Sequence, residues 1–437
     1  MKLRFDLLSQ WRATSSDPVL VAIWGTGLVI RLLFMPITFH SDLYQIYSRA
    51  AFAVASGDWF AWNAQLLAQV VHNLWFMLVR LLLPAQDGIW SPTAGVAGIG
   101  AQPADIERFL AYPLLARALV LLKLPYLLGD ALTGWCLLRL APGVSRRWLL
   151  ALWWLNPIVI YTSALFGRHD TLWIALLVAG CLAATHERRW LGFVLSALAA
   201  IARFFPAFVL PFYIVSVRRG WRQVVVGLGA LVFAWFVVDT AVVVLRGVSP
   251  TLTLLGDYPH VRYLVALAVP VGDDIPLAVF PLVYVFALCY WISRAPSGVD
   301  AYRAAAGALL CAIVALTPVH PQYVVWALPF AVPTLARNGI GRTIAAVQAG
   351  LFFVWLLRWG ASVTTGLFLP LGSSVVEALP DPQLVAAALV PPAVWQPVVR
   401  AAFTAVTLWI GWSVVEDGLL RRGACQPQRA ELVGELR

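Results

Sequence analysis

Long runs of apolar residues alternate with short polar connections along the whole chain. An α-helix needs about 20 apolar residues to cross the hydrocarbon layer of a membrane. The runs are continuous and do not alternate at every second residue, so they predict helices and not the strands of a barrel. The pattern predicts an all-α polytopic membrane protein with about 12 (11–13) transmembrane helices. We place them at residues 19–39, 117–139, 148–166, 170–185, 190–204, 206–217, 223–245, 276–293, 302–318, 321–336, 342–358 and 399–419.

The composition leads to the same class of protein. Of the 437 residues, 61% are hydrophobic and only 12% are charged. Soluble proteins are about half apolar and about a quarter charged. So large an apolar content excludes a soluble enzyme and a disordered chain, and we expect residues 1–437 to form a single transmembrane domain.

The basic residues fall on alternate connections between the predicted helices. An excess of Lys and Arg marks the cytoplasmic side of a membrane protein. We therefore expect both termini in the cytoplasm, a cytoplasmic tail at 421–437, and the long connections 40–116, 246–275 and 359–398 outside. The formal net charge of +10 then reflects topology and does not indicate a nucleic-acid partner. The residues that mark the inner side are Lys2, Arg4, Arg12, Arg139, Arg146, Arg147, Arg188, Arg189, Arg218, Arg219, Arg222, Arg294, Arg303, Arg337, Arg342, Arg421, Arg422, Arg429 and Arg437.

Residues 64–84, within the first outer connection, are apolar enough to form a further transmembrane helix. A transmembrane helix here would invert the chain downstream and move the Arg-rich connections outside. We therefore predict an interfacial or re-entrant helix on the outer face, with His72 and Arg80 on its wet side.

Several ionisable residues lie inside or at the ends of the apolar runs, where a charge costs a few kcal/mol. Lys123 and Asp130 lie seven residues apart on one predicted helix, near the same face. They form either a buried ion pair between helices or part of a substrate site. Arg31 and Arg203 lie towards the ends of their helices and are candidates for the same site. For Asp239 a structural role is favoured.

Three polar turns follow predicted helices on the outer side. They read His40-Ser41-Asp42, Arg168-His169-Asp170 and His320-Pro321-Gln322-Tyr323. On the predicted topology all three face outward, so they are able to converge on one site at the outer membrane boundary.

The chemistry of these turns suits a lipid-linked anionic substrate. A carboxylate at Asp42 is placed to act as general base towards a hydroxyl. Arg and Lys suit a phosphate, Arg through its bidentate fork. His320 is a donor to that phosphate or to a sugar hydroxyl, while His169 and Asp170 position the acceptor.

No cofactor is expected. A divalent metal held by Asp42, His169, Asp170 and His320 is an alternative that no ligand spacing supports. The chain has no phosphate-binding glycine loop and no HExxH motif, which argues against a nucleotide-dependent enzyme.

The ordered set of motifs resembles the GT-C glycosyltransferases over roughly residues 20–335. The first turn, His40-Ser41-Asp42-Leu43-Tyr44, is similar to their acidic motif and the loop helix behind it. The similarity continues in Asn156-Pro157, in Ser163-Ala164-Leu165-Phe166-Gly167-Arg168-His169-Asp170, in Arg203-Phe204-Phe205-Pro206 and in His320-Pro321-Gln322-Tyr323. The chain departs from the family in having the single acid of Ser41-Asp42 and in having Phe166-Gly167-Arg168 where Trp-Gly-Gln is frequent.

The resemblance implies a membrane enzyme that transfers a hexose, with mannose favoured, from a polyprenyl-phosphate donor. The acceptor is a lipid, a glycan or a protein outside the cytoplasm, and transfer is inverting and metal-independent. Asp42 matches the family's catalytic carboxylate. The alternatives are a secondary transporter, a flippase, or a polymerase or ligase of lipid-linked glycans. With Asp42 as the catalytic residue, we expect the substrate to contact Arg31, His40, Lys123, Arg168, His169, Asp170, Arg203, His320, Gln322 and Tyr323.

Overall fold

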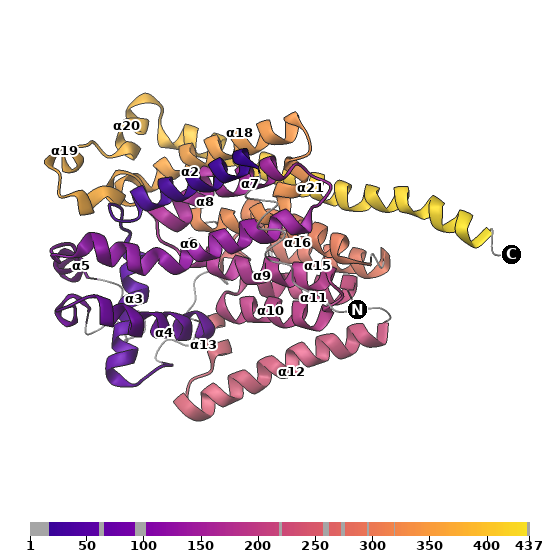
Figure 1. The fold of residues 1–437 in the computed structure, drawn as a ribbon, viewed down its shortest axis with the longest axis horizontal. Coiled ribbons are helices and arrows are strands. Elements are labelled where there is room, and N and C mark those ends of the chain that lie inside the picture. Colours follow the sequence, from indigo (N-terminus) through magenta and orange to yellow (C-terminus); the bar gives the residue numbers. More distant parts are fainter. Residues whose placement is uncertain are drawn as a thin grey trace.

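The chain is almost entirely helical (Figure 1). The computed structural model describes residues 17–60, 65–91, 102–217, 221–256, 262–271, 276–294, 297–318 and 320–434. The described residues include one antiparallel strand pair, Ala268–Val269 (β1) and Leu277–Ala278 (β2), with Ala268 opposite Ala278. The prediction of an all-α fold is confirmed.

The described helices range from single turns to the long helix α21. The first half contains Pro18–Phe34 (α2), Ser41–Ser56 (α3), Leu66–Leu82 (α4), Asp87–Ile89 (η1), Pro103–Leu110 (α5), Leu115–Leu140 (α6), Arg146–Trp154 (α7), Pro157–Ile160 (α8), Tyr161–Leu165 (η2), Asp170–Thr185 (α9), Arg189–Ala202 (α10) and Phe205–Val217 (α11). The second half contains Trp221–Arg246 (α12), Pro250–Gly256 (α13), Val279–Arg294 (α15), Val299–Leu316 (α16), Pro321–Trp326 (η3), Leu328–Leu335 (α17), Gly339–Leu356 (α18), Leu357–Val363 (η4), Thr365–Leu371 (η5), Ser374–Glu377 (α19), Pro382–Leu389 (α20) and Pro392–Gly434 (α21).

The predicted number of transmembrane helices was wrong. Among the described residues, five helical segments are long and apolar enough to cross a membrane, and α5 with α6, bent by 107°, adds a sixth. The five segments are Arg146–Leu165, Arg222–Arg246, Val299–Leu316, Gly339–Val363 and Pro392–Gly418. Each of them overlaps a predicted transmembrane helix.

Length explains the difference. The runs at 170–185, 190–204 and 206–217 form the helices α9, α10 and α11, of 16, 14 and 13 residues. At a rise of about 1.5 Å per residue these helices are shorter than the roughly 30 Å of a bilayer's hydrocarbon layer. The run at 321–336 is likewise divided between two short helices, η3 and α17.

The first long connection has a hydrophobic core of its own. Residues from α3, α4, α5 and the start of α6 bury an aromatic cluster that includes Tyr44, Phe76, Trp90 and Phe109. Helix α4 occupies most of the segment 64–84 and packs on α3. The placement of His72 on a wet side was wrong, because His72 is buried and shares a hydrogen bond of 2.9 Å with the Tyr126 hydroxyl. The Arg80 side chain, in contrast, is partly exposed.

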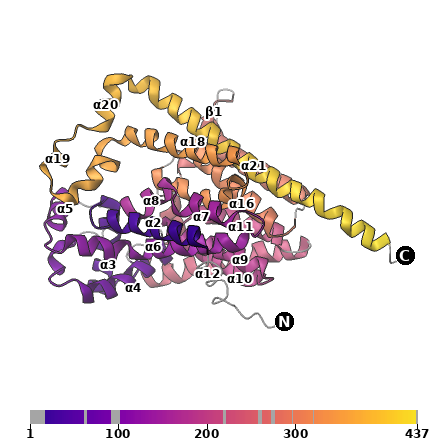
Figure 2. The same cartoon turned by 45° about the horizontal axis from the view of Figure 1, so that its top comes forward.

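Two long helices present apolar side chains to the outside. Helix α12 lies along one edge of the molecule (Figure 1), and α21 extends beyond its body (Figures 1 and 2). Val232, Phe233 and Phe236 of α12 are all more than 60% exposed. Large apolar side chains cover such a surface where lipid is the solvent. Asp239 on the same helix is structural, since it accepts hydrogen bonds from the Ser249 hydroxyl and the Thr251 amide at 2.8 Å.

Helices α6 and α9 cross at Gly129. A Cβ atom added at Gly129 would lie 2.8 Å from the Cα atom of Leu172. Small residues let two helix backbones approach this closely in membrane proteins. The crossing holds the start of α9, and with it the second polar turn, against α6.

Candidate active site

Asp42 lies in the first turn of α3, at the surface of the protein. His40 caps this helix, and its Nδ1 accepts a hydrogen bond of 3.1 Å from the Asp42 amide. The His40 ring stacks on Phe166 with the ring centres 3.8 Å apart. The Asp42 side chain is 33% exposed, and its Oδ2 lies 2.9 Å from an Arg168 guanidinium nitrogen. The first and second polar turns therefore meet at Asp42.

The second turn depends on a glycine. Gly167 has a φ of 72°, in the left-handed region that glycine adopts at no steric cost. A Cβ atom at this position would also lie 3.1 Å from Lys123 Cε and 3.2 Å from Leu43 Cδ2. The turn directs Arg168 towards Asp42 while α9 begins directly afterwards at Asp170.

A chain of alternating charges runs inward from Asp42. Arg168 Nε lies 3.8 Å from Asp170 Oδ2, and Arg203 Nε lies 3.1 Å from Asp170 Oδ1. Arg203 then donates to the Tyr323 hydroxyl at 3.2 Å. Trp326 donates to Asp170 Oδ1 at 2.8 Å. The three turns converge as predicted, and the aspartates of the first two turns balance Arg168 and Arg203, the latter at the end of α10.

The electrostatics keep Asp42 ionised. Burial raises the pKa of Asp42, but the neighbouring groups, Arg168 first and then His40, His320 and Arg203, together outweigh burial and lower the pKa below its ordinary value. Burial lowers the pKa of His40 to about 4, with Asp42 opposing that shift. At neutral pH a neutral imidazole therefore lies beside a carboxylate that is able to accept a proton.

The other predicted residues of these turns lie at different depths. The ring of His320 lies 5.7 Å from that of Tyr323, and it also lines a cavity described below. Gln322 is buried, and its Oε1 has no hydrogen-bond partner among the described residues. His169 points inward, where its Nδ1 accepts a hydrogen bond of 2.5 Å from Trp173.

Lys123 stabilises the segments next to the first two polar turns from their buried side. Its ammonium group is fully buried and donates to main-chain oxygens of both turns, at 2.6 Å to Thr38 and 2.9 Å to Ala164. The Thr38 hydroxyl accepts a further bond at 2.9 Å. These contacts occupy the ammonium group with protein acceptors. Lys123 thereby positions the segments that carry Asp42 and Arg168.

Of the two roles predicted for Lys123 and Asp130, the buried ion pair between helices holds for Asp130, but its partner is not Lys123. Asp130 pairs instead with Arg31, whose Nε lies 2.9 Å from its Oδ2, and both side chains are fully buried. Ser163 donates to the same carboxylate oxygen at 2.5 Å. Arg31 also donates to the Trp154 carbonyl at 2.7 Å. The structure therefore places Arg31 in a buried network that ties α2 to α6, and does not bring it to the Asp42 carboxylate.

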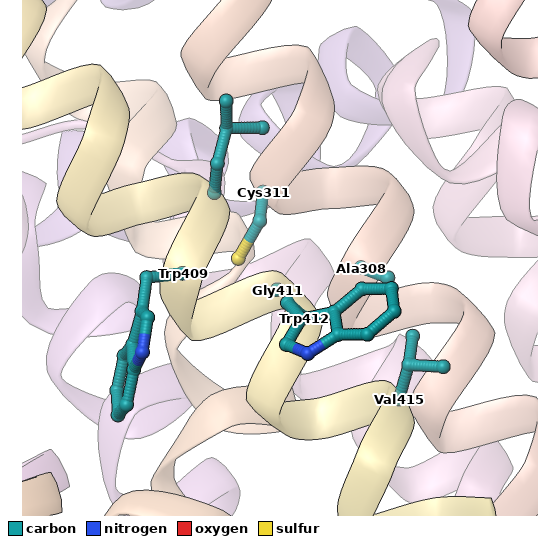
Figure 3. A pocket seen from close by; sticks show the side chains of 7 residues that line it. Ala308, Cys311, Trp409, Gly411, Trp412 and Val415 are labelled. Carbon is teal, nitrogen blue, oxygen red and sulfur yellow. The ribbon is translucent and has the colours of Figure 1, made fainter.

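Cavities of different character lie in the described part of the chain. One of about 490 Å³ lies between α16 and α21, lined by Cys311, Trp409 and Trp412 with other uncharged residues (Figure 3). A second, of about 420 Å³, is lined mainly by apolar residues of α18, η4 and η5. The third, of about 520 Å³, is basic and aromatic. Its lining residues are Tyr263, Ala266, Leu267, Ala315, Leu316, Thr317, Pro318, His320, Trp355, Arg358, Trp359 and Arg400.

The sequence analysis missed Arg358 and Arg400. Arg358 follows Leu356 and Leu357 at the end of an apolar run, and Arg400 begins the last predicted helix, so both resembled charges at helix ends. Their stacking with Trp355 links segments far apart in the chain. The Trp355-x-x-Arg358-Trp359 spacing could have indicated a binding site, because it places a cation beside two indoles. No three His, Cys, Asp or Glu side chains within the described ranges are grouped so as to hold a metal ion.

One comparison with known proteins gives a match. Residues 110–219 match the family model described as alpha-(1->6)-mannopyranosyltransferase, N-terminal domain. The matched segment holds Lys123, Asp130, Arg168, Asp170 and Arg203, and it ends before the third turn. Neither the curated proteins nor the solved structures gave a match. The match covers about a quarter of the chain, and over these residues the chain is similar to the N-terminal domain of the alpha-(1->6)-mannopyranosyltransferases.

Proposed function

We propose that the protein transfers mannose from a polyprenyl-phosphate donor to a hydroxyl of a lipid, glycan or protein acceptor, with inversion and without a metal ion. The observation that carries the proposal is the Asp42 carboxylate, which is partly exposed at the outer end of a buried chain of alternating charges. A carboxylate held in this way is a fixed base at the surface of an otherwise apolar protein.

The geometry of Asp42 supports a single displacement at the anomeric carbon. The acceptor oxygen forms a bond to that carbon as the bond to the donor phosphate breaks, and the electron pair leaves on the phosphate. Asp42 accepts the proton of the acceptor hydroxyl. Because Arg168 stabilises the ionised carboxylate, the base is available before the acceptor arrives.

The surrounding residues have roles that follow from their positions. Arg168 orients Asp42 and keeps it charged, while Asp170 and Arg203 hold Arg168 and Tyr323 in place behind it. His40 and His320 lie near Asp42 as neutral groups able to bind sugar hydroxyls. Gln322 adds a buried amide beside Tyr323. His169 and Lys123 act indirectly, through packing and through the shape of the turns.

The distribution of basic residues supports an extracytoplasmic site. We propose that both termini and residues 421–437 are cytoplasmic and that residues 40–116 form an outer region within a single transmembrane domain. The separate aromatic core of that region fits a folded segment outside the lipid. Asp42 lies at its start, so the proposed base is on the same side as the acceptor.

A transfer assay with the full-length protein in lipid nanodiscs tests the proposal. We expect transfer from short-chain polyprenyl-phosphate mannose but not from GDP-mannose, unchanged by EDTA, with NMR of the product showing inversion. Transfer from GDP-mannose, loss of activity with EDTA, or retention would each contradict the corresponding part. Movement of the intact donor across proteoliposomes without transfer would favour a flippase instead.

A further inference from the structure

The charge chain behind Asp42 leaves no net positive charge for an anionic donor. Arg168 and Arg203 are balanced by Asp42 and Asp170. Arg31 is likewise balanced by Asp130. A donor phosphate that leaves with an added negative charge needs cations that are not already neutralised. Such cations have to come from outside the charge chain.

Arg358 and Arg400 are cations of this kind. Among the described residues, no carboxylate lies within ion-pair distance of either guanidinium. Both line the cavity of about 520 Å³, together with His320 and the two indoles of Trp355 and Trp359. Two cations in one cavity repel each other unless an anion is bound between them.

Arg400 is held in place by one of its nitrogens and leaves another unused. Its Nη2 donates to the carbonyls of Ala315 at 3.0 Å and Thr317 at 2.8 Å, where α16 ends. The end of a helix that carries free carbonyls stabilises a cation. Its Nη1 is buried and has no hydrogen-bond partner in the part of the chain that the structure describes. A buried donor without a partner is costly, and a bound oxygen anion would satisfy it.

Arg358 is held by aromatic rings. Its guanidinium carbon lies 4.6 Å from the ring centre of Trp355 and 4.9 Å from that of Trp359. The two indoles meet edge to face at 5.6 Å. Stacking leaves the edge of a guanidinium, which carries its N–H donors, free to bind an anion. The apolar faces of the same indoles suit a hydrocarbon chain attached to that anion.

His320 connects this cavity to the charge chain. It lines the cavity, and its ring packs on Tyr323, whose hydroxyl accepts from Arg203. The charges that act on His320 come from both sides: Asp42, Arg168 and Arg203 from the chain, and Arg358 from the cavity. A sugar beside His320 would therefore have the proposed base on one side and the two unpaired cations on the other.

We propose that the cavity lined by Arg358, Arg400, Trp355 and Trp359 binds the phosphate of a prenyl phosphate and so holds the leaving group of the donor. This assignment rests on the proposed function, and it replaces Lys123 and Arg203 as the phosphate contacts. When the bond from the anomeric carbon to the phosphate oxygen breaks, the electron pair passes to the phosphate, and Arg358 and Arg400 stabilise the added charge.

Binding of farnesyl phosphate, inorganic phosphate and farnesol to the full-length protein in nanodiscs tests the assignment by calorimetry. We expect farnesyl phosphate to bind, Arg358→Gln to weaken it about tenfold or more, and Asp42→Asn to leave it unchanged. Arg342→Gln is the matched control, because Arg342 lies on the same helix α18 and stacks on Trp148 at 4.2 Å, away from the cavity. Trp359→Ala should also weaken binding.

Three results would overturn the assignment. One is wild-type affinity in Arg358→Gln. Another is equal affinity for inorganic phosphate, which would make the cavity a general anion site, and the third is equal affinity for farnesol, which would make it an apolar groove. If binding depends on Arg358 while the wild-type protein transfers no mannose, the proposed function fails and the cavity assignment stands.

Discussion

The carboxylate of Asp42 and the guanidinium of Arg168 lie 2.9 Å apart, although they belong to separate polar turns of the chain. The contact holds the partly exposed Asp42 side chain against the nearly buried Arg168 side chain. Arg168 in turn lies beside Asp170, which pairs with Arg203. The orientation and charge of Asp42 therefore depend on the charge chain behind it.

Replacing Asp42 with Asn should remove the proposed general base. We expect kcat to fall by about 10²–10⁴-fold, the range that general base catalysis contributes, with the KM for donor little changed. Transfer kinetics in nanodiscs measure this. Asp87→Asn, at an exposed acid in the same outer region, should behave as wild type. Near-normal turnover by Asp42→Asn would remove the residue from the mechanism.

Replacing Arg168 with Met should shift the pH dependence of transfer. Arg168 lowers the pKa of Asp42, and Asp42 acts as a base only above that pKa. Without the guanidinium the pKa rises, so the acid limb of the kcat profile should move to higher pH. Arg168→Lys retains a positive charge and should move the limb less. An unmoved acid limb in Arg168→Met would show that another group controls it.

Asp130→Asn should destabilise the protein without changing its chemistry. The substitution leaves Arg31 buried without a counter-charge, which costs about 3–5 kcal/mol. Thermal unfolding in detergent should show a lowered midpoint, and activity per folded molecule should stay near wild type. The double substitution of Arg31→Met with Asp130→Leu removes both charges and should recover part of the loss. An unchanged midpoint in Asp130→Asn would contradict the structural role.

Lys123→Met should distinguish a structural role of Lys123 from a role in binding the donor. The substitution keeps the length of the side chain but leaves the Thr38 carbonyl without its Lys123 donor, at about 1–3 kcal/mol for an unsatisfied group, and removes one of two donors to the Ala164 carbonyl. We expect a lower unfolding midpoint and a lower kcat, with the KM for donor unchanged. A large rise in the KM for donor would indicate that Lys123 contacts the donor.

Gly129→Ala should force α6 and α9 apart, because the added methyl group meets the Leu172 backbone. Overpacking of this kind costs about 1–3 kcal/mol. Gly25→Ala on α2 is the control, since a Cβ atom there meets nothing within 4 Å and alanine favours helices. Equal unfolding midpoints for the two variants would mean that the crossing tolerates a side chain.

The sequence predicted the all-α fold and the meeting of the three polar turns because both follow from simple constraints. Apolar runs of this length form helices in lipid, and alternate turns of a membrane protein share a side. The number of membrane crossings was not predictable in the same way. The runs that form α9, α10 and α11 are apolar, and apolar content alone does not distinguish a buried short helix from one that crosses the bilayer.

The partners of the buried charges could not be predicted from the sequence either. Lys123 and Asp130 share a helix and a face, which suggested a common environment. The side chains nevertheless find different partners, because Lys123 reaches the turn at Gly167 while Asp130 lies beside α2. Arg358 and Arg400 were missed for a similar reason, since only the packing of α18 against α21 brings them to one cavity.

The Arg31–Asp130 pair also constrains how the protein is made. Arg31 is synthesised first, in the apolar helix α2, and Asp130 follows only when α6 emerges. A buried charge without a partner is costly, so the buried position of Arg31 is stable only once Asp130 is in place. The final packing of α2 therefore has to wait for α6, and the ion pair imposes an order on folding.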